Sequence, residues 1–138
     1  MATPGTSETL PLGGSDDVVR ARHQVREVAI ELGFDLVAQT RIVTATSELA
    51  RNTHLHGGGG KLTITPVADG ARRGLRLEFV DDGPGIADVQ LALTDGWSSQ
   101  GGLGLGLSGT KRLMDEFTIE SRPGGGTRVE VVQWLTRR

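Results

Sequence analysis

A carboxylate and a carboxamide lie four residues apart in the middle of the chain, in the segment Glu48-Leu-Ala-Arg-Asn52. On a helix this spacing places both side chains on one face, one turn apart. A carboxamide oxygen can bind Mg²⁺ without adding charge, and a carboxylate beside it can accept a proton or orient water. An ordinary solvated helix face has the same spacing, so the pair alone does not define a site.

The segment Asp81-Asp82-Gly83-Pro84-Gly85 directly follows a strand pattern. Its glycines permit positive φ angles or a close approach of the backbone to another group. A carboxylate at the end of a strand can point into a pocket. The same residues also make a good tight turn that closes a hairpin. Both interpretations fit this segment taken alone.

The segment Gly101–Leu107 begins with two glycines and then alternates leucine and glycine, ahead of a helical pattern. Free backbone N–H groups in front of a helix form an anion site, and phosphate is the common guest. Flexible linkers contain similar glycine patterns, although in a linker the three leucine side chains would be exposed to water. No Gly-Lys-Ser/Thr follows, which excludes a P-loop, and no clean strand precedes, which excludes a Rossmann turn.

The hydrophobic pattern predicts the elements that position these segments. Glu8–Leu12 is expected to be an edge strand, and the glycines 57–60 are expected to form a mobile turn. The expected helices cover about 18–32, 35–55, 86–93 and 107–117, and the further strands cover 61–67, 73–80, 118–121 and 127–134. Antiparallel strand pairs with helices between them favour a two-layer α+β sandwich formed by one domain over residues 1–138, with 1–7 as a disordered tail.

Composition excludes several classes of protein. The chain has 138 residues, with 15 Lys and Arg against 17 Asp and Glu, a formal net charge of −2. This balance argues against nucleic-acid binding through a bulk positive field. The absence of cysteine excludes disulfides, thiol nucleophiles, zinc ribbons and iron–sulfur clusters. No apolar run approaches the roughly 20 residues of a membrane span, and no secretory signal pattern begins the chain, so the sequence predicts a cytoplasmic protein.

In this order the three segments resemble the Bergerat (GHKL) ATP-binding superfamily of gyrase-type ATPases, the heat-shock protein 90 family, histidine kinases and bacterial anti-sigma serine kinases. Within it, the chain is similar from about Val18 to Leu135 to the RsbT-type switch kinases of the bacterial stressosome. That similarity is carried by Glu31–Phe34, Thr46–Asn52, Asp82–Ile86, Gly101–Gly104 and Lys111–Phe117. The last segment is the most diagnostic, because generic ATP binding does not need it. The implied fold is a mixed, mostly antiparallel sheet with helices on one face.

The resemblance implies an ATP- and Mg²⁺-dependent protein serine/threonine kinase. Glu48 takes the place of the family's general base, Asn52 that of its Mg²⁺ ligand, and Asp81 that of its acceptor for the adenine amino group. Thr127 matches the family's threonine at the adenine pocket, although an ordinary strand threonine is an equally good interpretation. The residues that the resemblance assigns to the nucleotide are Asn52, Asp81, Gly83, Gly85, Ile86, Gly102, Leu103, Gly104, Leu105, Gly106 and Thr127.

The resemblance also implies partners. The expected substrates are STAS-domain scaffold proteins of a general stress-response pathway, and the released kinase would activate a PP2C-type phosphatase by binding it. Neither a nucleic acid nor a membrane is expected as a partner. One departure concerns the lid at about 87–101, where some relatives place an arginine that meets the phosphates. Here the lid contains no Lys or Arg, which predicts slow phosphoryl transfer.

Three alternatives remain open at this stage. The chain could be an anti-sigma factor that sequesters a sigma subunit, with kinase activity regulating release. It could be the catalytic part of a histidine kinase, although the segment around His23 is too short to supply a dimerisation hairpin. It could also be a nucleotide-gated scaffold without catalysis. Among neighbouring residues, His54 and His56 are expected on different helix faces, which disfavours a metal site, and Arg51 is expected off the Glu48/Asn52 face.

Overall fold

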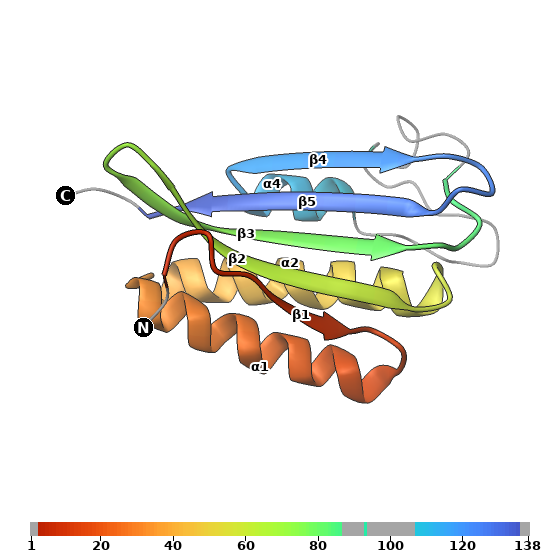
Figure 1. Cartoon of the computed structure of the whole chain (residues 1–138), viewed down its shortest axis with the longest axis horizontal. Coiled ribbons are helices and arrows are strands. Elements are labelled where there is room, and N and C mark those ends of the chain that lie inside the picture. The colour runs from red at the N-terminus through yellow and green to blue at the C-terminus, as the bar shows by residue number, and fades with distance from the viewer. Residues whose placement is uncertain (1–2, 87–92, 94–106, 136–138) are drawn as a thin grey trace.

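The computed structural model describes residues 3–86, 93 and 107–135 of the chain. Strands and helices follow one another there in the order β1 (Glu8–Pro11), α1 (Ser15–Leu32), α2 (Leu36–Leu55), β2 (Gly60–Asp69), β3 (Arg72–Asp81), α4 (Leu107–Leu113), β4 (Glu116–Ser121) and β5 (Thr127–Trp134). The strands form one sheet in the order β1-β2-β3-β5-β4. Figure 1 shows α1, α2 and α4 on the same face of this sheet.

The two-layer α+β architecture predicted from the sequence is confirmed. The pairs among the described strands are all antiparallel, where the resemblance implied a mixed sheet. Because β5 lies between β3 and β4, the end of β3 adjoins the start of β5. This order brings the segment after Asp81 next to the β4–β5 hairpin.

Local sequence explains where the two long helices begin and end. Gly33 adopts a left-handed conformation with φ of 96° and ends α1, a position that favours glycine. Asp35 caps the N-terminus of α2, because its carboxylate accepts a 2.8 Å hydrogen bond from the Ala38 amide. The turn between the helices is therefore short, and the two helices pack side by side against the sheet (Figure 1).

The core lies between the helices and one face of the sheet. Alternate residues of β2, β3 and β5 point toward the helices and are buried, as the period of two in these strands predicts. The apolar side chains of these strands in the core cluster are Leu62, Ile64, Leu75, Leu77, Phe79, Val129 and Val131. They pack against the helical residues Ala21, Val25, Val28, Ala29, Ile42, Ala45, Leu49 and Ala50.

The opposite face of the sheet is polar. Arg128 of β5 donates hydrogen bonds to Glu78 of β3, Glu120 of β4 and Glu130, at 2.6, 3.0 and 2.9 Å. Glu78 and Glu120 lie on the strands at either side of β5, so their ion pairs with Arg128 cross the sheet, whereas Glu130 is on β5 itself. This charged network gives three adjacent strands a face suited to water.

Two helix predictions need comment. The helix predicted over 107–117 ends at Leu113, and Glu116 and Phe117 already belong to β4. The error arose because Leu113 and Met114 extend the apolar helical pattern, whereas Phe117 pairs with Val131 in the sheet. Pairing with a distant strand overrides the local pattern here. The helix predicted over 86–93 lies outside the described residues, apart from its two ends.

Candidate functional site

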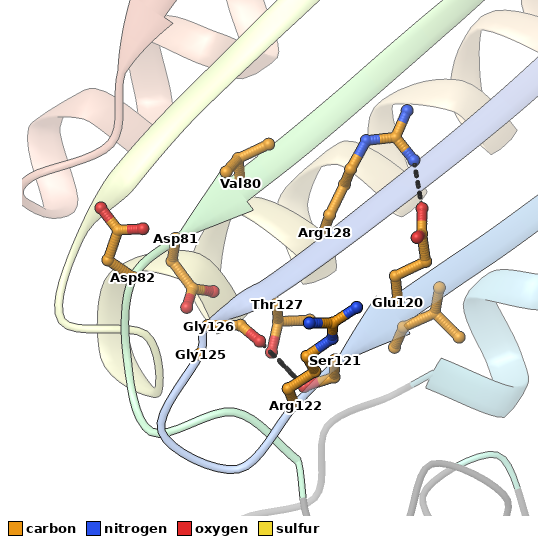
Figure 2. A pocket seen from close by; sticks show the side chains of 11 residues that line it. Val80, Asp81, Asp82, Glu120, Ser121, Arg122, Gly125, Gly126, Thr127 and Arg128 are labelled. Carbon is orange, nitrogen blue, oxygen red and sulfur yellow. Dashed lines mark hydrogen bonds and ion pairs between the residues drawn. The ribbon is translucent and has the colours of Figure 1, made fainter.

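Asp81 and Thr127 are paired where β3 ends and β5 begins. The Oδ1 atom of Asp81 accepts a hydrogen bond of 2.9 Å from the Gly83 amide, and the Thr127 amide also bonds to this carboxylate. Both residues line a pocket of about 610 Å³ at the end of the sheet (Figure 2). The fold therefore brings together the two residues that the sequence analysis assigned to the adenine.

The Asp81 carboxylate is partly withdrawn from water. Burial raises its pKa above the ordinary value of 3.8, while the hydrogen bonds from the Gly83 and Thr127 amides lower it. The charge of Asp82 raises the pKa further, and the net direction is upward. Withdrawal from water without an ion pair costs folding free energy and favours a polar ligand that restores the lost hydration.

Glycines let the backbone close around this carboxylate. A Cβ atom on Gly57 would lie 2.3 Å from Cγ of Asp81, and one on Gly83 would lie 2.7 Å from the Gly57 backbone. The sequence analysis treated Gly57 as part of a mobile turn and missed this packing. The signal was the position of the four-glycine run, directly after the helix that carries Glu48 and Asn52.

A second pair of glycines locks the segment after β3 against the β4–β5 turn. Gly85 and Gly126 have positive φ angles of 76° and 82°. A Cβ atom on Gly85 would lie 2.0 Å from the Arg122 carbonyl oxygen, and one on Gly126 would lie 2.1 Å from that of Asp81. Neither position can hold a side chain without movement of the backbone.

Ser121, which the sequence analysis did not single out, connects the same two segments. Its hydroxyl accepts a 2.7 Å hydrogen bond from the Ile86 amide and donates to the Gly126 carbonyl at 3.1 Å. Its oxygen also lies 2.8 Å from the Thr127 hydroxyl (Figure 2). Since a serine hydroxyl donates only one hydrogen bond, Thr127 is the donor in this contact and keeps free acceptor capacity.

Glu48 and Asn52 lie one turn apart on α2, as predicted. Glu48 is partly exposed, and its Oε1 atom pairs with the Arg51 guanidinium at 3.2 Å. Arg51 therefore reaches the carboxylate although its position is off the face shared by Glu48 and Asn52. This contact was not foreseen.

The end of α2 connects the Glu48/Asn52 pair to the pocket. The Asn52 carbonyl accepts hydrogen bonds from the amides of His56 and Gly57, at 2.9 and 3.1 Å. Gly57 in turn packs on Asp81. The helix that carries Glu48 and Asn52 thus ends against the Asp81 carboxylate, which lines the pocket.

Several expected site residues lie outside the described residues, namely Gly102, Leu103, Gly104, Leu105 and Gly106. No group of three His, Asp or Glu side chains that could hold a metal ion occurs in the part that the structure describes. A single carboxamide such as Asn52 suits Mg²⁺ only where phosphate oxygens and water supply the remaining ligands. The described residues thus contain no self-contained metal site, and the assignment of Asn52 as a metal ligand stays a prediction.

Comparison with known proteins identifies the family of the chain. The pattern that defines the histidine kinase-, DNA gyrase B- and HSP90-like ATPases matches residues 37–137. The chain belongs to this ATPase family. The predicted superfamily is thereby confirmed, and with it the use of ATP that its name describes.

Relatives of this ATPase narrow the assignment. It is 51% identical over 119 residues to the serine/threonine-protein kinase RsbT of Bacillus subtilis strain 168, a similarity that covers 86% of this chain and 90% of the relative. It is 30% identical over 121 residues to the anti-sigma F factor of Thermoanaerobacter sp. strain X514, with 83% of each chain covered. The similarity to RsbT confirms the predicted resemblance to RsbT-type kinases. It also confirms the predicted enzyme class, serine/threonine-protein kinase.

Solved structures support the same fold for this ATPase. The RsbU and RsbW domains of a Mycobacterium tuberculosis protein superpose with a TM-score of 0.64 at 24% identity, covering 99% of this chain and 34% of that one. The chain thus spans about a third of the length of that structure. The catalytic domain of the histidine kinase ThkA superposes with a TM-score of 0.55 at 18% identity, covering 91% and 95%.

Within the described residues, none of the helices combines the length and apolar character needed to cross a bilayer.

Proposed function

We propose that this ATPase is a protein serine/threonine kinase that uses Mg²⁺ and ATP to phosphorylate STAS-domain partner proteins in a general stress response. On release from these partners, it activates a PP2C-type phosphatase by binding. The observation that carries the kinase proposal is Glu48, a partly exposed carboxylate one turn before Asn52 on the helix that ends against the Asp81 pocket. The 51% identity to an RsbT kinase supports the partner class.

In this proposal the Asp81 pocket holds adenine. The adenine amino group is a donor, and the Asp81 carboxylate keeps acceptor capacity beyond its bonds to the Gly83 and Thr127 amides. Thr127 offers a further acceptor, because its hydrogen is engaged by Ser121. Gly83, Gly85 and Ile86 are assigned to the adenine site by the resemblance, and the two glycines let the backbone close against Gly57 and the Arg122 carbonyl beside Asp81. Gly102–Gly106, with Leu103 and Leu105, supply backbone amides to the phosphates.

Asn52 is the residue that would hold the metal. Bound Mg²⁺ would neutralise charge on the phosphates. The Asn52 carboxamide is neutral and lies on a regular helix. It would therefore provide one metal ligand in a fixed place without adding negative charge near Glu48.

Glu48 is the general base. It accepts the proton of the acceptor hydroxyl while the hydroxyl oxygen forms a bond to the γ-phosphorus and ADP leaves. Arg51, 3.2 Å from this carboxylate, fixes its orientation from the exposed side of the helix. With no Lys or Arg between 87 and 101, the chain itself brings no lid cation to the phosphates, and transfer is expected to be slow.

The alternative function is an anti-sigma factor that sequesters a sigma subunit, with kinase activity regulating release. Its support is the 30% identity to an anti-sigma F factor, which extends over most of both chains. Direct retention of a sigma subunit by the immobilised protein, with no transfer to a STAS-domain protein, would favour it.

Phosphotransfer tests the proposal. The pure protein is incubated with Mg²⁺, γ-labelled ATP and purified STAS-domain proteins of its source, beside the variants Glu48→Ala and Glu27→Ala. Removal of a general base costs about 10²- to 10⁴-fold in rate, so Glu48→Ala should lose transfer and retain ATP binding. Glu27 is an exposed glutamate on α1, and its removal should leave the rate unchanged. Equal transfer by wild type and Glu48→Ala would refute the assigned mechanism.

A further inference from the structure

Arg41, on α2, makes contacts that the proposed chemistry leaves unexplained. Its Nε atom donates a 3.1 Å hydrogen bond to the Leu113 carbonyl, and its Nη2 atom donates a 3.3 Å bond to that of Arg112. These carbonyls belong to the end of α4, where backbone oxygens lack partners within the helix. A guanidinium there satisfies two carbonyls at once and complements the negative end of the helix.

Arg41 lies on the same face of α2 as the proposed catalytic pair. It precedes Glu48 by seven residues and Asn52 by eleven, and at 3.6 residues per turn both separations return to nearly the same direction. α4 packs against α2, on the same side of the sheet (Figure 1). Leu107 and Thr110 of α4 are buried. One face of one rigid helix therefore carries the base, the metal ligand and the residue that holds α4.

The contact also gives a structural role to the segment Lys111–Phe117, the most diagnostic part of the resemblance, which generic ATP binding does not need. Its carbonyls at 112 and 113 bond to Arg41, and Met114 is in the core. The Asp115 carboxylate accepts a 2.8 Å hydrogen bond from the Trp134 amide at the end of β5. The segment is thus fixed from α2 on one side and from the sheet on the other.

We propose that Arg41 is a positioning residue that sets α4 at a fixed place along the Glu48/Asn52 face of α2. This inference rests on the proposed function, in which the glycines directly before Leu107 bind the phosphates. The start of α4 is where those glycines join the described fold. A shift of α4 along α2 would change the place of the phosphates relative to Glu48. The adenine pocket lies at the ends of β3, β4 and β5, and β4 is held in the sheet by its pairing with β5, so the pocket should keep its shape.

The test separates phosphate recognition from base recognition. Affinities for ATP and adenosine are measured by calorimetry for the wild type, Arg41→Met, Arg41→Lys and Arg20→Ala. Methionine keeps much of the apolar stem of Arg41 and removes both donors. Lysine keeps the charge but cannot bridge two carbonyls in a planar fork. Arg20 is the matched control, an exposed helical arginine whose pair with Asp17 is local.

Arg41→Met should bind ATP about tenfold more weakly, the factor that corresponds to one ordinary hydrogen-bonded contact, and adenosine within about two-fold of the wild type. Arg41→Lys should lie between, and Arg20→Ala should match the wild type. Amide hydrogen exchange in α4 should accelerate in Arg41→Met, with α1 unchanged. These results together support the inference.

Equal losses for ATP and adenosine would overturn it, because they would mean that Arg41 only stabilises the fold. Unchanged affinity for ATP would overturn it as well. Should Arg41→Met fail to fold, Arg41→Lys decides by the same criterion. A wild type that binds no ATP would refute the proposed function itself, which distinguishes that failure from a failure of the positioning role alone.

Discussion

The proposed nucleotide site has two halves that are held in different ways. The base half, around Asp81, is an interlock of backbones in which added Cβ atoms on Gly85 and Gly126 would lie 2.0 and 2.1 Å from carbonyl oxygens. The catalytic half, on α2, consists of side chains: Glu48 and Arg51 are 37% and 52% exposed and share one ion pair. Gly85 and Gly126 of the base half thus have no room for a Cβ atom, whereas the exposed side chains of the catalytic half can turn without moving the backbone.

The largest expected effect on stability comes from breaking the interlock. Gly85→Ala combines a positive φ with a steric clash, and the two together should lower the free energy of unfolding by about 2–5 kcal/mol. Gly124→Ala is the matched control, because Gly124 has a similar φ of 75° and open space around it. Its cost should be about 1–2 kcal/mol. Urea unfolding measures both, and equal costs would contradict the interlock.

Asp81→Asn should separate stability from binding. The amide oxygen can still accept the backbone bonds, and the cost of burying a charge disappears, so the melting temperature should hold or rise. The new NH₂ group is a donor that would face the adenine amino group, so ATP affinity should fall by about ten- to hundredfold. Thermal unfolding and calorimetry on the same samples test this, and unchanged affinity would remove Asp81 from the base site.

The pH dependence of the same variant sharpens the comparison. The pKa of Asp81 is raised in the folded state, chiefly by burial, so the folded protein holds this proton more tightly than the unfolded chain. Its favourable contribution is therefore complete below the ordinary value of 3.8 and is lost as the pH rises through the raised pKa. The stability advantage of Asp81→Asn over the wild type should grow across that window. If the stability advantage of Asp81→Asn shrank with rising pH, the pKa of Asp81 would be lowered rather than raised in the folded protein.

The smallest effect belongs to the catalytic half. Arg51→Ala removes an exposed ion pair between residues three apart on a helix, which is worth about 0–1 kcal/mol. The melting temperature should hardly move, while phosphoryl transfer should fall because Glu48 loses its orienting partner. Chemical denaturation and the transfer assay are the paired measurements. A large loss of stability would mean that the catalytic half, like the base half, depends on close packing.

Local patterns predicted most of the fold. Gly33 and Asp35 marked the break between the two long helices, and the alternating residues of β2 and β3 gave their hairpin, because these features depend on near neighbours. The end of α4 was misplaced, since Phe117 belongs to a strand only by its pairing with Val131.

The site was predicted less completely, because it also depends on contacts between residues far apart in the chain. The resemblance named Asp81, Thr127 and the Glu48/Asn52 pair. It could not show that Gly57 packs on Asp81 or that Ser121 holds Ile86, because these contacts join residues far apart in the chain. A glycine in a run of four has no local mark that separates a close approach from a flexible link.

The lock between Gly85 and the β4–β5 turn also orders events during synthesis. The residues that shape the base pocket are divided between the end of β3 and the hairpin that follows α4, so the first group leaves the ribosome well before the second. A nascent chain that ends before Thr127 contains Glu48 and Asn52 but lacks the residues that close the proposed adenine pocket. We therefore expect nucleotide capture only in chains whose β4–β5 hairpin has emerged.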